Sequence, residues 1–145
     1  MRKLNALIAG STGYIGVQLI KLLIKHKKVK IKFLCGNNSV GKNISFYDNT
    51  LKSNKLPKIT KFDKKFLKEI DVIFTALPNG EAQEISNHLI ERNTLIDLAA
   101  DFRLNKASEY LKWYKKKHKA KNNIKKSIYS LPEITGRNVK NFDII

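Results

Sequence analysis

The sequence predicts an α/β fold in which a mostly parallel sheet carries helices on both faces. Three observations support this prediction. An apolar run at 4–9 leads through a glycine-rich turn into a helix-like run, later short apolar runs alternate with helix-period segments, and 42% of the 145 residues are hydrophobic. Strands that alternate with helices are typical of parallel sheets. Because this length and composition supply one substantial core, we expect residues 1–145 to form a single domain.

The first elements follow from apolar periodicity. Residues 4–9, apolar except for Asn5, predict the first strand, and 29–35 predict the second. Between them, 14–26 predict a helix with Ile15, Leu19, Leu22 and Leu23 on one face. The segment 36–60 is rich in Asn, Ser, Lys and Gly and has little periodicity, so we expect a long loop with at most a short strand.

The second half repeats the alternation. Residues 71–76 read as a buried strand that Pro78 and Gly80 end, and 81–92 as a helix with acidic residues at its start. In that helix the spacing of Ile85, His88 and Leu89 predicts a packed face. We further expect a strand at 94–98, a helix capped by Ser108 and running through residue 114, and two short strands at 127–131 and 142–145.

The turn after the first strand is a candidate phosphate site. It has a G-x-x-G-x-x-G spacing and lies between strand and helix, the order found in Rossmann-like domains. Glycines let the backbone turn tightly and approach a pyrophosphate, whose charge free N–H groups and the positive end of a helix then stabilise. We therefore predict that the cofactor is bound by Gly10, Ser11, Thr12, Gly13, Tyr14, Ile15 and Gly16.

The end of the second strand indicates which dinucleotide fits. NAD sites place an acidic residue roughly 20 residues after the glycines to bind the ribose hydroxyls, yet no acidic residue occurs from 17 to 47. Instead Asn38 and Ser39 offer hydrogen-bond donors and Lys42 a positive charge, which suits a 2′-phosphate. The sequence therefore favours NADP over NAD, with a polar surface loop as the alternative interpretation of the same residues.

A second loop is expected to reach the cofactor from across the cleft. Leu77, Pro78 and Gly80 follow the third clear strand, and ligands of parallel sheets bind beyond the carboxyl ends of the strands. We predict that these three residues contact the cofactor. The alternative is that proline and glycine only end the strand.

Composition limits the remaining classes. The formal charge of +17 allows a polyanion-binding surface, but the lysines are spread along the chain and their two clusters fall where helices end, so we predict no specific nucleic-acid partner. There is no apolar stretch of roughly 18 residues for a membrane span. A single cysteine, Cys35, is typical of a reducing compartment, and we expect a cytoplasmic protein with no metal site.

Together the motifs resemble N-acetyl-gamma-glutamyl-phosphate reductase, an NADPH-dependent enzyme of arginine biosynthesis. The resemblance covers essentially the whole chain. It is carried, in order, by residues 10–16, 71–80, 96–104 with Ala100-Asp101-Phe102-Arg103, 113–114 with His118, and 129–133 with Leu131-Pro132-Glu133. Two positions depart from the family pattern, which usually has Ser at Ala99 and Gly at Ser130.

The resemblance implies a reaction and its residues. A cysteine thiolate attacks the acyl phosphate, phosphate leaves, and NADPH reduces the thioester, with a histidine as acid and base. The family carries that cysteine after the strand matching 143–145 and the histidine in a second domain, so no catalytic residue is expected in this chain. Cys35 lies on the ribose side and is not the nucleophile, and His26, His88 and His118 read as structural or solvated.

Arg103 is the substrate residue that the resemblance implies, because a guanidinium can grip a carboxylate or phosphate with two hydrogen bonds. The alternative is an ion pair with Asp97 or Asp101, of which Asp101 reads as a structural carboxylate fixing its loop. We thus expect the NADP-binding N-terminal part of an oxidoreductase that is inactive alone, acts on a small acyl phosphate and is homo-oligomeric when complete. The alternatives are an aspartate-semialdehyde dehydrogenase-like reductase and a basic non-catalytic nucleotide or nucleic-acid module.

Overall fold

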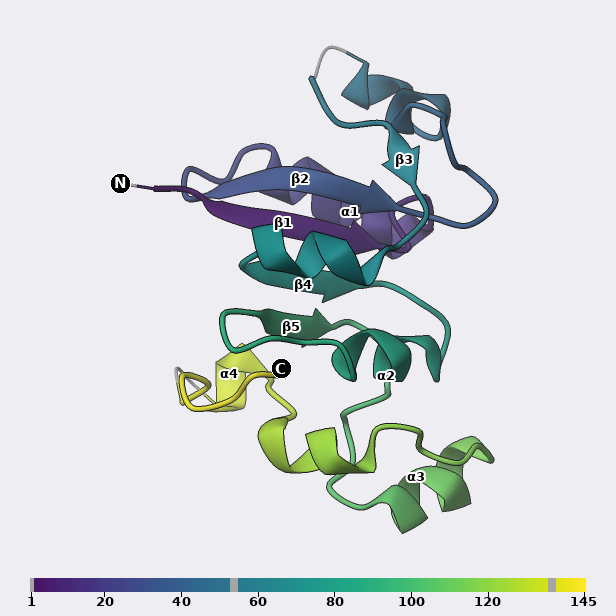
Figure 1. Ribbon diagram of the computed structural model, residues 1–145, viewed down its shortest axis with the longest axis vertical. Helices are drawn as coiled ribbons and strands as arrows, with labels where there is room; N and C mark the ends of the chain where they lie inside the picture. The colour runs from purple at the N-terminus through teal and green to yellow at the C-terminus, as the bar shows by residue number, and fades with distance from the viewer. Residues whose placement is uncertain (1, 53–54, 136–137) are drawn as a thin grey trace.

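A five-stranded, entirely parallel sheet forms the centre of the protein (Figure 1). The computed structural model describes residues 2–52, 55–135 and 138–145. The strand order is β3-β2-β1-β4-β5. The strands are β1 (Leu4–Ala9), β2 (Val29–Cys35), β3 (Ile59–Thr60), β4 (Val72–Thr75) and β5 (Thr94–Asp97).

Helices connect the strands and continue past β5. The α-helices are α1 (Tyr14–Leu23), α2 (Glu81–Ser86), α3 (Ala107–Tyr114) and α4 (Pro132–Thr135). The 3₁₀ helices are η1 (Ile44–Phe46), η2 (Asn49–Leu51), η3 (Lys64–Glu69) and η4 (Lys121–Lys126). The predicted α/β architecture with a parallel sheet and helices on both faces is confirmed.

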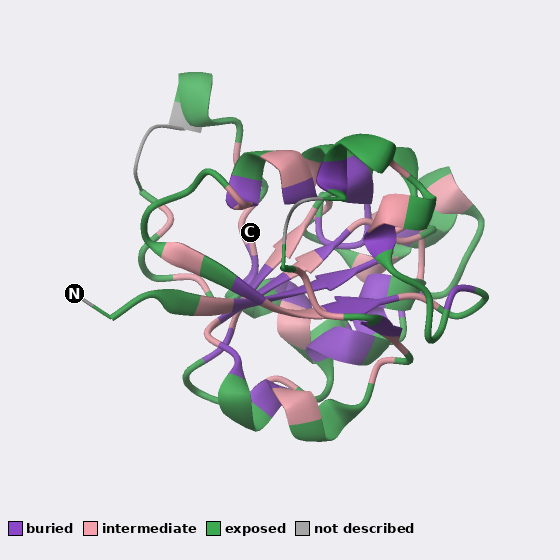
Figure 2. Cartoon of the chain, turned by 90° about the horizontal axis from the view of Figure 1, so that it is seen from above, coloured by how far each residue is buried: buried purple, intermediate pink, exposed green. Residues whose placement is uncertain are grey.

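One hydrophobic cluster lies on each face of the sheet. Figure 2 shows the buried strands between layers of helix. On one face Ile8 and Leu34 pack against Val17 and Ile20 of α1, together with η1 and η2. On the other face Leu7, Ile73 and Leu95 pack against residues of η3 and α2 and against Ala120, which precedes η4. The central strands β1 and β4 supply apolar side chains to both faces, as burial on both faces requires.

The helix boundaries are shorter than the sequence predicts. α1 ends at Leu23 rather than 26, and α2 ends at Ser86 rather than 92. After α2 the chain makes a turn fixed by Asn93, whose buried amide donates to the carbonyls of Leu67 and Ile70 at 3.0 and 2.7 Å. His88 is consequently exposed, so its predicted packed face is wrong.

Three other details differ from prediction. α3 begins at Ala107 with Lys106 as N-cap, so Ser108 lies inside the helix and does not cap it. The two short strands expected near the C-terminus are reduced to isolated parallel bridges from Ile144 to Leu95 and to Ser127. In the part of the chain that the structure describes, no helix is long and apolar enough to cross a membrane.

Asp71 ties together the amino ends of three strands. Its carboxylate accepts the backbone N–H of Asn5 at 2.8 Å and guanidinium hydrogen bonds from Arg2 and Arg92. Burial opposes ionisation of this 13% exposed side chain, but these donors win and lower the pKa of Asp71 from 3.8 to about 2. Since the folded pKa lies below the unfolded one, the stabilisation is present above pH 4 and is lost as pH falls toward 2.

We therefore expect Asp71→Asn to lower the free energy of unfolding at pH 7 by about 1–3 kcal/mol, because charged hydrogen bonds are lost. The difference from the wild type should shrink as pH falls from 4 to 2. Urea unfolding across this range measures both. Glu91→Gln is the control, since Glu91 is exposed and makes no ion pair among the described residues. A difference that does not vary with pH would contradict the account.

Candidate functional site

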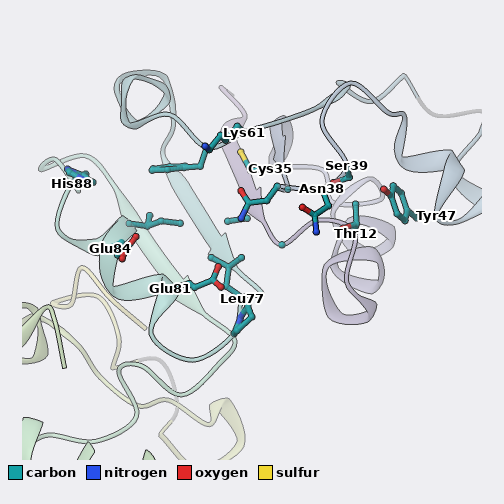
Figure 3. A pocket seen from close by; sticks show the side chains of 17 residues that line it. Thr12, Cys35, Asn38, Ser39, Tyr47, Lys61, Leu77, Glu81, Glu84 and His88 are labelled. Atoms are coloured by element: carbon teal, nitrogen blue, oxygen red, sulfur yellow. The ribbon is translucent and has the colours of Figure 1, made fainter. Parts of the chain in front are cut away.

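A pocket of about 830 Å³ opens beyond the carboxyl ends of the central strands (Figure 3). Its wall begins at the glycine turn after β1 and continues along the loop after β2, with Lys61 and Phe62 after β3. The loop after β4 and one side of α2 with the turn that follows complete it. This is the edge at which parallel sheets bind their ligands.

Two of the three glycines in the turn are required by packing. Gly10 has φ +80°, and a Cβ there would lie 2.1 Å from the carbonyl oxygen of Ala76 at the end of β4. A Cβ at Gly16 would lie 2.2 Å from the carbonyl oxygen of Gly10, so α1 approaches the turn closely only because no side chain intervenes. At Gly13 the nearest atom to a Cβ would be 3.6 Å away, and the space beside it is open.

The turn presents backbone N–H groups without partners. The N–H groups of Gly10 and Ser11, and the Ser11 hydroxyl, all donate to the carbonyl of Cys35 at 3.0–3.1 Å. The next donors along the turn have no hydrogen-bond partner among the described residues; these are the N–H groups of Thr12, Tyr14, Ile15 and Gly16. They lie at the positive end of α1, so the turn can bind an anion.

The seven predicted residues of this turn are thus divided by the structure. Gly10 and Thr12 line the pocket. Ser11 and Gly16 are buried in the packing of the turn, whereas Gly13 is exposed. Tyr14 and Ile15 direct side chains to solvent, with 83% and 50% of their surfaces exposed, so only their backbone is available to a ligand in the turn.

The loop after β2 lines the pocket with Asn38 and Ser39. Asn38 is exposed, whereas Ser39 is only 3% exposed and its hydroxyl has no hydrogen-bond partner in the described part of the chain. A buried hydroxyl without a partner is costly, so a ligand atom that bonds to it would be favoured. Lys42 is placed differently from its prediction, because its ammonium lies 4.7 Å from the ring centre of Phe46 and the residue does not line the pocket.

Of the three residues predicted to bind the cofactor in the loop after β4, two line the pocket and one does not. Leu77 and Pro78 line the pocket. Gly80 adopts φ +102° at the start of α2 and does not line it, because its N–H donates to the Asp101 carboxylate at 2.7 Å. Its contact with a cofactor therefore stays a prediction without support from its position.

Asp101 holds this loop and α2 in place. Its fully buried carboxylate accepts the N–H groups of Gly80 and Ala82, the Gln83 amide at 3.1 Å and the Tyr110 hydroxyl at 2.7 Å. It thus supplies a cap for α2 from a distant part of the chain. Burial and the bond to Asp101 raise the pKa of Tyr110. The interpretation of Asp101 as a structural carboxylate is confirmed.

His118 fixes the backbone of the same loop. Its Nε2 lies 2.8 Å from the Asp101 carbonyl oxygen, so Nε2 carries the proton, and Nδ1 accepts the N–H of Ala120 at 3.1 Å. Both ring nitrogens are therefore occupied in the packed core, which supports the structural interpretation of His118. Sequence analysis placed it at a basic helix terminus, but the residue is buried.

Arg103 lies in a smaller second pocket of about 210 Å³, together with Asp97, Tyr129 and Ile145. Its guanidinium donates to the Ala99 carbonyl at 3.2 Å and lies 5.3 Å from the Tyr129 ring centre. It makes no ion pair with Asp97 or Asp101 among the described residues, so that alternative is wrong. Burial raises the pKa of the Asp97 carboxyl, even though Thr75 donates a hydrogen bond to it.

Cys35 is an inert wall of the larger pocket. It is buried, and burial raises the pKa of its thiol to about 11, so the nucleophilic thiolate is scarce at neutral pH. This agrees with the prediction that Cys35 is not the catalytic nucleophile.

Several pocket residues were not singled out by sequence. They are Asn37, Tyr47, Lys61, Phe62, Glu81, Glu84, Ile85 and His88. Lys61 could not be found from the sequence because it follows β3, the parallel partner of β2. This strand is only two residues long and lies in a segment without periodicity. The sequence shows that α2 begins with the acidic residues Glu81 and Glu84, but it does not show that this side of the helix faces the pocket.

The chain matches a family model described as semialdehyde dehydrogenase, NAD binding domain, over residues 5–142. It belongs to this family. The crystal structure of aspartate semialdehyde dehydrogenase with NADP from Candida albicans is similar to this semialdehyde dehydrogenase domain, with a TM-score of 0.57 and 26% identity over 72% of this chain and 32% of that one. The protein is therefore a Rossmann-like, NAD(P)-binding domain.

Curated relatives of the domain are N-acetyl-gamma-glutamyl-phosphate reductases. The protein of Brachyspira hyodysenteriae is 43% identical over 88% of this chain and 36% of its own length. That of Ehrlichia ruminantium is 38% identical over 95% of this chain and 40% of its own length. The chain thus spans about two fifths of the length of these relatives.

We expect Asp101→Asn to lower the free energy of unfolding by about 3 kcal/mol, because an amide NH₂ would face backbone donors inside the core. Chemical unfolding monitored by Trp113 fluorescence and circular dichroism measures the loss. Asp143→Asn is the matched control, since that carboxylate is half exposed and reaches Lys126 only at 3.9 Å; its effect should stay below about 0.5 kcal/mol. Equal effects of the two substitutions would show that the Asp101 network does not organise the loop.

Proposed function

We propose that the chain is the NADP-binding part of an N-acetyl-gamma-glutamyl-phosphate reductase. In the reaction of the complete protein, N-acetyl-gamma-glutamyl phosphate, NADPH and a proton give N-acetyl-glutamate semialdehyde, phosphate and NADP⁺. The observation that carries the proposal is the identity of 34–43% with reductases of this name along nearly the whole chain. The unpartnered N–H groups at the start of α1 support it independently, because they fit a pyrophosphate.

The residues of the larger pocket fit a dinucleotide. Gly13 is exposed and so lets a phosphate reach the turn, and the N–H groups of Thr12, Tyr14, Ile15 and Gly16 would hold it. Leu77, Pro78 and Ile85 supply apolar surface for a ring, and Ser39 offers a buried hydroxyl that has no partner among the residues the structure describes. When bound, the nicotinamide cofactor supplies hydride to the substrate.

NADP is the proposed form of the cofactor. No acidic residue follows β2 at the position where NAD sites bind the ribose hydroxyls, and residues 17 to 47 contain none. The pocket wall at this end instead carries Asn38, Ser39 and Lys61. The Candida albicans structure that resembles this chain is one with NADP.

Arg103 is proposed to bind the anionic substrate. It lies in the second pocket, and its guanidinium is paired with a carbonyl oxygen and an aromatic ring rather than with a carboxylate. The positive charge is thus available to a carboxylate or phosphate. The nucleophilic cysteine and the histidine acid/base that the family resemblance implies would come from the remaining length of the reductase.

The complete enzyme is proposed to be a cytoplasmic homo-oligomer. An aspartate-semialdehyde dehydrogenase-like reductase is the second candidate, because the solved structure described above has that name. The order of motifs from Gly10 to Glu133 favours the first, as do the curated relatives.

The substrate decides between the two candidates. We expect the complete protein that carries this chain to oxidise N-acetyl-glutamate semialdehyde with NADP⁺ and phosphate at least tenfold faster than aspartate semialdehyde, measured by NADPH absorbance. The isolated 145-residue chain should bind NADPH and show no turnover. Faster reaction with aspartate semialdehyde would overturn the proposal in favour of the second candidate, and turnover by the isolated chain would overturn the division of the active site.

Gly13→Ala tests whether the turn binds the cofactor. The added methyl group meets no protein atom closer than 3.6 Å and the backbone has φ −72°, so stability should change by less than about 1 kcal/mol. It would project into the space proposed for the pyrophosphate, and NADPH affinity in fluorescence titration should fall at least tenfold. Gly16→Ala is the contrast and should destabilise the fold itself. Unchanged affinity in a folded Gly13→Ala protein would place the phosphates elsewhere.

A further inference from the structure

We infer that Lys61, the residue that directly follows β3, binds the 2′-phosphate that distinguishes NADP from NAD. Lys61 acts in this way only if the pocket holds the proposed dinucleotide, so the role rests on the proposed function. Sequence analysis assigned the positive charge to Lys42 instead.

The register of β3 places Lys61 at the end of β2. Ile59 pairs with Leu34 and Thr60 with Cys35, both in parallel. The N–H of Gly36 then donates to the carbonyl of Thr60 at 3.0 Å. Lys61 is therefore level with the first residues after β2, where NAD-specific domains carry the acid that binds the ribose hydroxyls. A cation at that level faces the 2′ position.

The ammonium of Lys61 is free to bind an anion. Lys61 is exposed and lines the pocket, and Figure 3 shows it beside Cys35 and opposite the α2 wall. It makes no hydrogen bond or ion pair with any of the described residues. The acid nearest in the chain, Asp63, accepts the N–H of Lys65 at 2.8 Å. Of the two acids that line the pocket, Glu84 pairs with Lys119 at 3.0 Å and Glu81 belongs to the α2 wall.

Lys42 contacts β3 and the aromatic side chains of η1 and its end rather than the pocket. Its carbonyl accepts the N–H of Ile59 at 3.0 Å, which anchors β3, and its ammonium lies over Phe46 at 4.7 Å and near Tyr47 at 6.0 Å. A cation held over aromatic rings in this way is already stabilised. Lys42 thus positions the strand from which Lys61 extends.

Ser39 provides a second, independent indication of a ligand at this end of the pocket. Ser39 lines the pocket from the loop after β2, and its buried hydroxyl has no hydrogen-bond partner among the described residues. A Cβ at Gly36 would lie 2.4 Å from this oxygen, so a side chain at position 36 has no room to act as its hydrogen-bond partner. A polar ligand group such as a ribose or phosphate oxygen fits the arrangement.

The test compares NADPH with NADH, which differ only in the 2′-phosphate. Dissociation constants are measured by fluorescence titration of the 145-residue chain, for the wild type, Lys61→Ala and Lys42→Ala. We expect Lys61→Ala to weaken NADPH binding about tenfold, because one charged hydrogen bond to the 2′-phosphate is lost. NADH binding should weaken less than twofold, because NADH lacks that phosphate. Lys42→Ala should change either constant less than twofold, and Lys61→Arg should retain most of the preference for NADPH.

The outcomes separate this role from the proposed function. Wild-type protein that binds neither nucleotide would contradict both. Wild-type protein that binds NADPH, with the preference unchanged in Lys61→Ala or lost in Lys42→Ala, would contradict the role of Lys61 alone. Because Lys61 is exposed, its variants should keep the circular dichroism spectrum of the wild type, and matching spectra exclude misfolding as the cause of weaker binding.

Discussion

The arrangement of both pockets depends on one buried carboxylate, that of Asp101. Taking a carboxylate out of water is costly, and four hydrogen bonds from Gly80, Ala82, Gln83 and Tyr110 offset that cost. The side chain thereby fixes the loop after β4 and the start of α2, which form one wall of the nucleotide pocket. The backbone of the same residue is held by Asp97 and His118, and two residues later Arg103 enters the second pocket. The two pockets that are proposed to bind the cofactor and the anionic substrate are therefore positioned by the same interaction.

The glycine turn complements this wall from the other side of the cleft. Gly10 approaches the end of β4 so closely that a side chain would collide with Ala76, and Gly16 packs against Gly10. The N–H groups of Thr12, Tyr14, Ile15 and Gly16 are left without hydrogen-bond partners among the described residues, whereas that of Gly13 donates to the Gly10 carbonyl at 3.2 Å. Structural glycines thus form a rigid frame, and Gly13 provides the open approach to it. The larger pocket has what a dinucleotide domain requires before any ligand is present: oriented donors, an apolar wall and a cation near the end of β2.

The sequence predicted those features that follow from local patterns. β1 and β2 were predicted to the residue, because their apolar runs end abruptly at the glycine turn and at Gly36. The end of α2 was not, because Asn93, in the turn that replaces the last predicted residues, donates to the carbonyls of Leu67 in η3 and of Ile70 just after it, more than twenty residues away. Asp101 was correctly interpreted as structural, but its partner Tyr110 lies on a helix whose packing no periodicity reveals. The choice between Lys42 and Lys61 likewise depends on the pairing of a two-residue strand, which is decided by tertiary structure.

The central claim is that the unpartnered amides at the start of α1 and the loop after β2 hold a dinucleotide. Titration of the ¹⁵N-labelled chain with NADPH, followed by amide chemical shifts, tests it most directly. The account predicts the largest shifts at Thr12 to Gly16, with further shifts at Asn38, Ser39 and Leu77, and little change at the Asp71 cluster on the opposite edge of the sheet. Binding that leaves the amides of the glycine turn unshifted would contradict it.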